Sequence, residues 1–224
     1  MKREIRTTSD GSKTLYIRDL KESYHSHHGA VQEAKHVFIE NGLKQIYNSQ
    51  INILELGFGT GLNVLVTIDE FIKTDKCHVC YYATIEKYPV TEEEVASLGY
   101  AALFENEEMR SIFRRIHECE WNEFTEIVPG FFLRKIQGDF HELHQLGIEP
   151  VDLVYFDCFG SRVQPDLWER DLFMKVSNLM RSGGLLTTYA SKGSVRRILQ
   201  ELGFKVEKKQ GPPGKREMIN ATKL

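Results

Sequence analysis

The stretch that most constrains the fold of this chain is a glycine-rich turn within residues 51–63. An apolar run leads to Glu55, and Gly57, Gly59 and Gly61 follow in the spacing G-x-G-x-G. Apolar residues then recur at helical spacing, so the stretch predicts a buried strand, a tight turn and a helix. The bare backbone of the turn and the free N–H groups of the helix N-terminus suit a nucleotide-like ligand. The same turn also occurs as a purely structural connection in α/β proteins.

The rest of the chain continues this alternation of strands and helices. Apolar runs bounded by glycine, proline or polar residues predict further strands, and helical periodicity fills the segments between them. We therefore expect a doubly wound, Rossmann-like α/β sheet of about seven strands, closed by an antiparallel pair. The expected strands are residues 51–56, 78–86, 131–136, 151–157, 185–189, 204–208 and 217–222, and the expected helices follow residue 61 and cover 91–117, 165–180 and 192–202.

A smaller unit precedes the sheet. Residues 3–18 alternate polar and β-prone residues around Ser-Asp-Gly-Ser, which predicts a hairpin. An amphipathic helix is expected from about residue 30 to residue 42. The predicted organisation is an N-terminal extension of residues 1–45 and one α/β domain of residues 46–224.

Composition excludes several classes of protein. Hydrophobic residues make up 41% and charged residues 27% of the chain, as in ordinary soluble domains. No apolar run approaches the roughly 18 residues of a membrane span, and no signal peptide is visible, so we expect a cytoplasmic protein without membrane contact. Cys77 and Cys80 lack a second cysteine pair, and the histidines at 25, 27 and 28 lack a carboxylate at ligand spacing. No metal is expected.

Acidic residues mark the ends of successive predicted strands. Glu55, Glu86, Asp139 and Asp157 all fall at the carboxyl edge of the sheet, where open parallel sheets bind ligands. Glu86 suits a ribose, because its oxygens only accept hydrogen bonds and can take both hydroxyl protons. Asp139 either caps the following helix or accepts from an adenine amino group.

The turn also discriminates between cofactors. It lacks the G-x-G-x-x-G spacing of dinucleotide oxidoreductases and the G-K-[ST] of a phosphate loop. Glu55 would repel a pyrophosphate but suits a ligand with an amino group and a sulfonium cation. This favours S-adenosyl-L-methionine over NAD. The expected cofactor-binding residues are Glu55, Gly57, Phe58, Gly59, Thr60, Gly61, Asn63, Glu86, Lys87, Gly138, Asp139 and Asp157.

Charge is distributed unevenly along the chain. Residues 181–224 carry ten Lys and Arg against three Glu, a net of +7, on a chain whose overall charge is −3. Such a basic segment indicates either a footprint for a polyanion or a solvated charged face.

Five blocks of sequence resemble one known family, the tRNA 5-methylaminomethyl-2-thiouridine methyltransferases (the MnmC/MnmD group). They are Glu55–Asn63, Tyr24-x-Ser-x-x-Gly-Ala-x-x-Glu33, the Tyr155–Gly160 block with Gln164–Trp168 behind it, Thr188–Phe204 and Gly214–Met218. One departure is Cys158, where relatives commonly have glycine, which puts the local backbone and the reach of Phe159 in question. Some members are fused to an FAD-dependent domain, and the short chain implies the stand-alone form.

The resemblance implies methyl transfer from S-adenosylmethionine to the primary amine of 5-aminomethyl-(2-thio)uridine at the tRNA wobble position. The acceptor must be a neutral amine, and Asp157 is expected to hold the ammonium form and receive its proton. Phe159 or Tyr189 would stack on the uracil, and the basic residues would contact anticodon-loop phosphates. No stable protein partner is expected. The residues expected to bind the substrate are Tyr24, Ser26, Glu33, Phe159, Tyr189, Lys192, Arg196, Arg197, Lys215 and Arg216.

Alternatives remain open from the residues alone. Asp157 would then bind only the cofactor's amino group, Phe159 and Tyr189 would be packed core aromatics, and the basic residues would be solvated surface. The rival functions are a methyltransferase of the same fold acting on a protein or small-molecule amine, a non-catalytic RNA- or cofactor-binding protein, and an NAD-dependent oxidoreductase.

Overall fold

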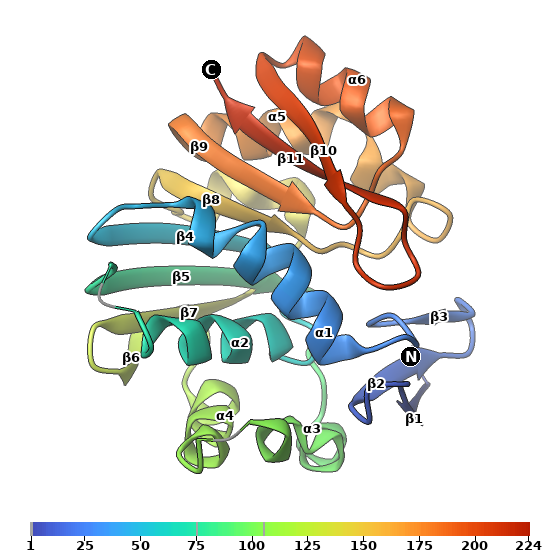
Figure 1. Ribbon diagram of the computed structural model, residues 1–224, viewed down its shortest axis with the longest axis vertical. Coiled ribbons are helices and arrows are strands. Elements are labelled where there is room, and N and C mark those ends of the chain that lie inside the picture. The colour runs from blue at the N-terminus through green and yellow to red at the C-terminus, as the bar shows by residue number, and fades with distance from the viewer. Residues whose placement is uncertain (1, 75, 105) are drawn as a thin grey trace.

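The computed structural model describes residues 2–74, 76–104 and 106–224. A central eight-stranded sheet carries helices on both faces, and a small three-stranded sheet lies beside its carboxyl edge (Figure 1). The central sheet has the strand order β10-β11-β9-β8-β4-β5-β7-β6. Its strands are β4 (Gln50–Leu56), β5 (Val79–Glu86), β6 (Thr125–Val128), β7 (Phe131–Gln137), β8 (Val151–Phe156), β9 (Met180–Thr188), β10 (Phe204–Gln210) and β11 (Glu217–Lys223).

The topology places a switch point in the middle of the sheet. Strand β4 pairs in parallel with both β5 and β8. The chain moves outward from β4 through β5 to β7, and then returns to the other side of β4 as β8. The loops after β4 and β8 therefore diverge and leave a crevice at their carboxyl ends.

The predicted Rossmann-like architecture is confirmed, with one strand more than expected. Strand β6 pairs antiparallel with β7, through a hairpin turn at Gly130 with φ of +80°. The sequence before Gly130 mixes charged and aromatic residues without clean alternation, and for that reason it reads as irregular.

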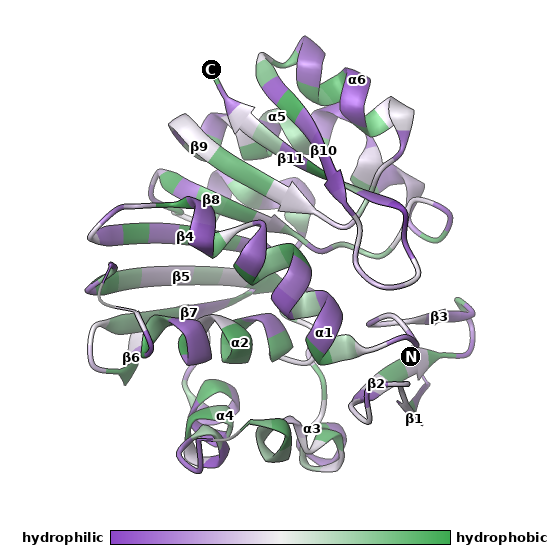
Figure 2. Cartoon of the chain, in the orientation of Figure 1, coloured by the Kyte–Doolittle hydropathy of each residue, from purple (hydrophilic) through white to green (hydrophobic). Residues whose placement is uncertain are grey.

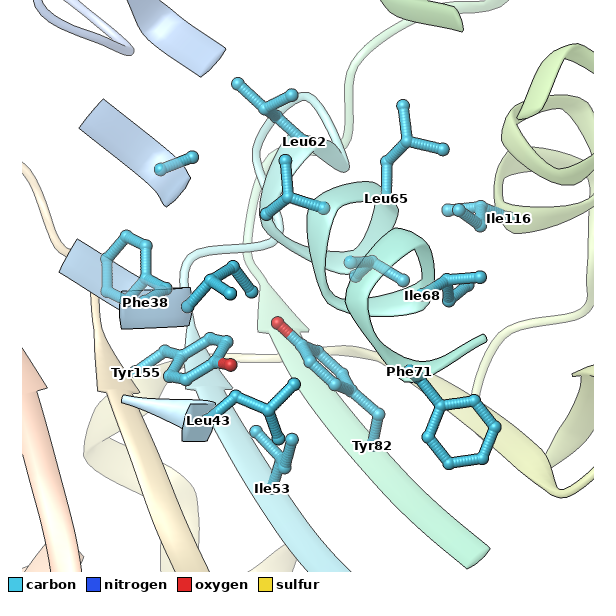
Figure 3. Packing of buried hydrophobic residues seen from close by; sticks show 14 of the residues in the cluster. Phe38, Leu43, Ile53, Leu62, Leu65, Ile68, Phe71, Tyr82, Ile116 and Tyr155 are labelled. Carbon is cyan, nitrogen blue, oxygen red and sulfur yellow. The ribbon is translucent and has the colours of Figure 1, made fainter. Parts of the chain in front are cut away.

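Helices cover both faces of the sheet, and each face has its own core. Alternate residues of one strand separate cleanly: Leu153 and Tyr155 belong to one core, and Val154 and Phe156 to the other. Figure 3 shows the first core, in which Phe38 lies beside Tyr155, while Leu65 points from one helix of this face toward Ile116 of another. The helices on this face are α1 (Ala30–Ala34) with its continuation Lys35–Glu40, α2 (Leu62–Phe71), α3 (Glu92–Leu98) and α4 (Met109–Glu118); those on the other are α5 (Arg170–Leu179) and α6 (Gly193–Glu201).

Two predicted helices are broken in the structure. The expected helix over 91–117 stops at Gly99, whose φ of +65° ends α3, and the 3₁₀ turn Tyr100–Leu103 separates it from α4. The expected helix over 165–180 divides into the 3₁₀ turn Pro165–Trp168 and α5. Two further 3₁₀ turns cover Leu43–Gln45 and Phe140–Gln145.

The predicted N-terminal hairpin is confirmed and gains a third strand. Its strands are β1 (Arg3–Thr7), β2 (Lys13–Ile17) and β3 (Glu22–Ser23). Arg3 donates to Glu94 at 2.9 Å, and Arg162 donates to Glu22 at 3.0 Å, so the small sheet is tied to both sides of the crevice. The helix that follows contributes buried residues to the first core, and Figure 2 shows hydrophobic and hydrophilic residues interleaved along it. The boundary near residue 45 stays a prediction.

Candidate functional site

A cleft of about 650 Å³ opens at the carboxyl ends of β4, β5 and β8. Its floor is the glycine-rich turn and Asp157, and the N-terminal loop from Leu20 to His28 covers one side. The loop between β10 and β11 reaches the other side, where Lys215 lines the cleft (Figure 1). This volume lies within the range of small-molecule sites, and its place at the switch point is where α/β sheets bind ligands.

In the glycine-rich turn, a side chain at Gly57 or Gly59 would collide with neighbouring atoms. Gly57 has a φ of +107°, and a Cβ there would lie 2.8 Å from the carbonyl oxygen of Asp157. Gly59 has a φ of +50°, and a Cβ there would lie 3.0 Å from the Tyr24 ring. The N–H groups of Gly57 and Phe58 both donate to the Ile85 carbonyl at 3.1 Å, which ties the turn to β5. The turn is therefore a bare backbone surface held in one position.

Glu86 is fixed on the cleft wall by the backbone. Its Oε2 accepts from the Gly59 N–H at 3.0 Å, and its Oε1 accepts from the Tyr88 N–H at 2.8 Å. Each carboxylate oxygen can accept a further hydrogen bond. The side chain can thus take two hydroxyl groups, as the ribose prediction requires.

Glu55 lies beneath the cleft and does not line it. The side chain is completely buried; Oε1 accepts from Asn63 at 2.8 Å and Oε2 from Thr84 at 2.6 Å. Burial, with a smaller contribution from the charge of Asp157, raises the pKa of Glu55 to about 8. The predicted direct contact of Glu55 with a cofactor does not fit this placement, because the strand turns the side chain into the protein.

Asn63 links Glu55 to the cleft. Its Nδ2 donates to Asp157 Oδ2 at 2.9 Å as well as to Glu55, so one amide group holds two carboxyl groups. The Asn63 Oδ1 atom is buried and has no hydrogen-bond partner among the described residues. An unpaired buried acceptor beside a cleft is suited to a donor group of a ligand.

Asp157 lies on the cleft floor with a perturbed pKa. Burial raises the pKa to about 7, and the charge of Glu33 adds to the rise, while the hydrogen bond from Asn63 and the charge of Lys215 oppose it. A carboxyl group that exchanges its proton near neutral pH is suited to general acid–base work.

The far end of the cleft is formed by a side-chain pair. Lys87 Nζ donates to Asp139 Oδ2 at 2.7 Å, and both residues line the cleft. Asp139 Oδ1 accepts from the His141 N–H at 2.9 Å and so caps the turn Phe140–Gln145, the first of its two expected roles. The adenine contact of Asp139 stays a prediction.

Two predicted glycines do not line the cleft. Gly138 donates its N–H to the Glu86 carbonyl at 3.2 Å, and Gly61 faces His117, whose Nε2 would lie 2.9 Å from an added Cβ. Both shape the walls of the cleft from behind. Phe58 and Thr60 do line it, as predicted.

The near end of the cleft brings together residues from distant parts of the chain. Lys215 Nζ lies 2.6 Å from Glu33 Oε1 and 3.8 Å from the centroid of the Tyr189 ring. The Tyr189 hydroxyl donates to the Cys158 carbonyl at 2.7 Å. The Ser26 N–H donates to Glu33 Oε2 at 2.9 Å. Four residues predicted from three separate blocks (Ser26, Glu33, Tyr189 and Lys215) thus form one group.

Cys158 does not distort the loop. Its backbone is outside the left-handed region, so the position does not require glycine. The neighbouring Phe159 ring lies on the cleft and meets the Tyr24 ring edge-on, with centroids 5.1 Å apart. The two aromatic side chains therefore share one wall of the cleft.

The predicted basic residues divide into two sets. Lys192 and Lys215 line the cleft. Arg196 is half-buried, and Arg197 and Arg216 are exposed; all three lie outside the lining. Arg196 and Arg197 lie on α6, and Arg216 lies in the β10–β11 loop.

Several residues that line the cleft were missed from the sequence, among them His25 and Trp168. His25 lines the cleft, and burial lowers its pKa to about 4, so its ring is neutral. Trp168 lines the cleft and donates its Nε1–H to the Phe159 carbonyl at 2.7 Å. Both lie within the quoted blocks, but a histidine among histidines and a tryptophan after a proline carried no separate signal. The described residues contain no cluster of metal-binding side chains and no helix able to span a membrane.

Comparison with known proteins shows which family the chain belongs to. A family model described as S-adenosyl-L-methionine-dependent methyltransferase matches residues 104–224, more than half of the chain. The chain belongs to this methyltransferase family. The family, the Rossmann-like fold and the choice of S-adenosylmethionine over NAD are thereby confirmed.

The methyltransferase has relatives over most of its length. It is 31% identical, over 88% of its length, to the tRNA 5-methylaminomethyl-2-thiouridine biosynthesis bifunctional protein MnmC of Leptospira borgpetersenii serovar Hardjo-bovis. It is 28% identical, over 94% of its length, to the protein of the same name from Actinobacillus pleuropneumoniae serotype 5b. It covers 31% and 34% of these two proteins, so it spans about a third of their length.

A solved structure resembles the whole methyltransferase. The crystal structure of MNMC2 from Aquifex aeolicus matches 99% of this chain and 70% of its own, with a TM-score of 0.77 and 26% identity. The match includes both the central sheet and the N-terminal extension, since only 1% of the chain lies outside it.

The residues of the cleft fit S-adenosylmethionine. The unpartnered Asn63 Oδ1 offers an acceptor for its amino group, the Gly57 and Gly59 backbone leaves room for a close approach, and Glu86 offers acceptors for its ribose. These three features lie along one continuous cleft.

Proposed function

We propose that this methyltransferase methylates the primary amine of 5-aminomethyl-(2-thio)uridine at the wobble position of tRNA. The observation that carries the proposal is the agreement between relatives and site. Proteins named for 5-methylaminomethyl-2-thiouridine biosynthesis match nearly the whole chain, and the five resembling blocks meet around one cleft. We expect the protein to act in the cytoplasm, with the anticodon loop of tRNA as its partner.

The chemistry asks for alignment and for a neutral nucleophile. When bound, S-adenosylmethionine supplies an electrophilic methyl group: the N–CH3 bond forms as the S–CH3 bond breaks, and the electron pair of the broken bond stays on sulfur. The remaining tasks for the protein are to place the amine in line and to remove its protons.

Asp157 is the expected proton acceptor. Its pKa of about 7 makes a substantial fraction ionised at neutral pH, and in that form it can take a proton from the acceptor's ammonium group. Asn63 donates its hydrogen bond to Asp157 Oδ2 at 2.9 Å, which leaves the other carboxylate oxygen, Asp157 Oδ1, free to face the cleft. Asn63 thus orients the base while Glu55, behind it, orients Asn63.

The remaining residues are expected to bind the base and the backbone of the RNA. The Phe159 ring, next to Asp157 and on the cleft wall, can stack on a uracil swung out of the anticodon loop. Lys192 at the rim, with Arg196, Arg197 and Arg216 outside it, can contact phosphates.

A transfer assay tests the proposal. The protein is incubated with methyl-labelled S-adenosylmethionine and with bulk tRNA that lacks the final methyl group. We expect label in 5-methylaminomethyl-(2-thio)uridine. Label in protein or in a small amine, or no label in RNA, would overturn the proposed acceptor.

A further inference from the structure

The ammonium group of Lys215 occupies a built cation site inside the cleft. Its Nζ lies 2.6 Å from Glu33 Oε1 and 3.8 Å from the centroid of the Tyr189 ring. A carboxylate and an aromatic face together are the elements that recognise an alkylammonium ion. The Glu33 side chain is only 11% exposed, so the pairing takes place largely out of water.

The walls of this site are fixed by other contacts. The second oxygen of Glu33 accepts from the Ser26 N–H at 2.9 Å, and the Tyr189 hydroxyl is anchored to the Cys158 carbonyl at 2.7 Å. The Trp168 ring meets Tyr189 edge-on, with centroids 6.0 Å apart. Glu33 and Tyr189 therefore remain in place without Lys215.

The lysine itself is the movable part. It lies at the end of the Gly211–Lys215 turn in the loop between β10 and β11, and its side chain is 34% exposed. Its long stem can place the ammonium elsewhere without disturbing the strands on either side.

The site adjoins the proposed base. Tyr189 binds the carbonyl of Cys158, the residue next to Asp157, and the charges of both Glu33 and Lys215 act on the Asp157 carboxyl. Asp157, Glu33 and Tyr189 line the same cleft. A primary ammonium bound between Glu33 and Tyr189 would lie beside the group that must take its proton.

We propose that Glu33 and Tyr189 form the subsite for the ammonium group of the acceptor, and that Lys215 is a stand-in cation which the acceptor displaces. This rests on the proposed function for its amine acceptor. The ion pair with Lys215 keeps Glu33 from being an unpaired buried charge in the free protein. A 5-substituent without positive charge cannot replace the lysine, so the exchange selects amines.

A binding experiment with nucleosides separates this role from phosphate contact. Proton NMR titration measures binding of 5-aminomethyluridine and its neutral analogue 5-hydroxymethyluridine, neither of which carries a phosphate. In Lys215→Met the competing cation is gone, and we expect 5-aminomethyluridine to bind about tenfold more tightly, with 5-hydroxymethyluridine unchanged. Lys205→Met, an exposed lysine of the same basic segment, is the matched control and should change neither.

A second variant keeps the test decisive if Lys215→Met folds poorly. Glu33→Gln retains the size of the side chain and an acceptor for Ser26 but removes the charge. We expect it to lose most of the preference for 5-aminomethyluridine over 5-hydroxymethyluridine. Weaker or unchanged amine binding in Lys215→Met, equal tightening for both nucleosides, or an unaltered preference in Glu33→Gln would overturn the inference.

The two proposals fail in different ways. If the wild-type protein labels no tRNA but Lys215→Met still binds the amine more tightly, the ammonium subsite stands and the acceptor is another amine. If tRNA is labelled and the nucleoside preferences do not change, the subsite fails alone.

Discussion

The two ends of the cleft are built in different ways: the cofactor end, where Glu86 and Asp139 lie and the cofactor is proposed to bind, and the acceptor end, where Glu33 and Lys215 lie. The cofactor end comes from consecutive strands of one sheet, β4, β5 and β7, whose carboxyl ends meet because parallel strands run in register. The acceptor end joins helix α1 to the β10–β11 loop, and its central ion pair links Glu33 to Lys215 across 182 positions of sequence.

The anchoring of the carboxylates follows the same division. Glu86, at the cofactor end, accepts from two backbone N–H groups and is fixed whenever the sheet is folded. Glu33, at the acceptor end, is held by one backbone N–H and by a side chain that can move. The end proposed for the cofactor is therefore preformed, whereas at the end proposed for the acceptor the lysine of the ion pair can be displaced.

The largest expected effect is on turnover in Asp157→Asn, which should lose catalysis while it keeps its affinity for the cofactor. Asp157→Asn keeps the shape of the side chain but cannot accept a proton, so kcat should fall by about 10²–10⁴-fold. S-adenosylhomocysteine affinity by calorimetry should change only a few-fold. Asp152→Asn is the matched control, since Asp152 lies at the opposite end of the same strand. Equal losses of turnover and cofactor affinity would assign Asp157 to the cofactor.

The second effect breaks the cofactor end alone. Gly57→Ala strains a left-handed backbone and places a Cβ 2.8 Å from the Asp157 carbonyl oxygen. A cost of about 1–3 kcal/mol predicts cofactor affinity lower by about 5- to 150-fold. Gly183→Ala controls for backbone strain, because the φ of Gly183 is also positive, at +79°, and a Cβ added there would have no atom of the described residues within 4 Å. Unchanged cofactor affinity in Gly57→Ala would show that the glycine-rich turn does not bind the cofactor.

The third effect concerns pH and the carboxyl groups beneath the cleft. Burial raises the pKa of Glu55 from 4.5 to about 8. Because its pKa is higher in the folded state than in the unfolded state, Glu55 stabilises the fold when it is protonated. This contribution to the free energy of unfolding is complete below pH 4.5 and is lost as pH rises through about 8. In urea unfolding, stability should fall between these limits by at most about 1.4 kcal/mol per pH unit for this group. The decline should be shallower in Glu55→Gln, and an unaltered slope would contradict the burial of this acid.

The smallest effect probes the exposed rim of the acceptor end. Arg197→Ala should weaken tRNA binding modestly and reduce the slope of log affinity against log salt by about one. Cofactor affinity should not change, because Arg197 lies outside the cleft. Arg114→Ala, on the exposed face of α4, serves as control and should leave the slope as it is. Equal slopes for the two variants would make the basic rim a solvated surface.

The sequence predicted the cofactor end far better than the acceptor end. Strand and turn follow one another within residues 51–63, and Glu86 ends the next strand, so local pattern determines Gly57, Gly59 and Glu86. The inward direction of Glu55 could not be predicted, because it depends on Thr84 of the neighbouring strand. The grouping of Glu33, Tyr189 and Lys215 depends on how helix α1, the loop after β9 and the β10–β11 loop meet, and the spacing of these residues in the chain does not reveal it.

The most direct test of the proposed acceptor is mass spectrometry of wobble nucleosides from cells with and without the gene for this protein. Loss of the gene should remove 5-methylaminomethyl-(2-thio)uridine and leave 5-aminomethyl-(2-thio)uridine in its place. Restoring the wild-type gene should reverse the change, and the Asp157→Asn gene should not. An unchanged nucleoside profile in cells without the gene would contradict the account.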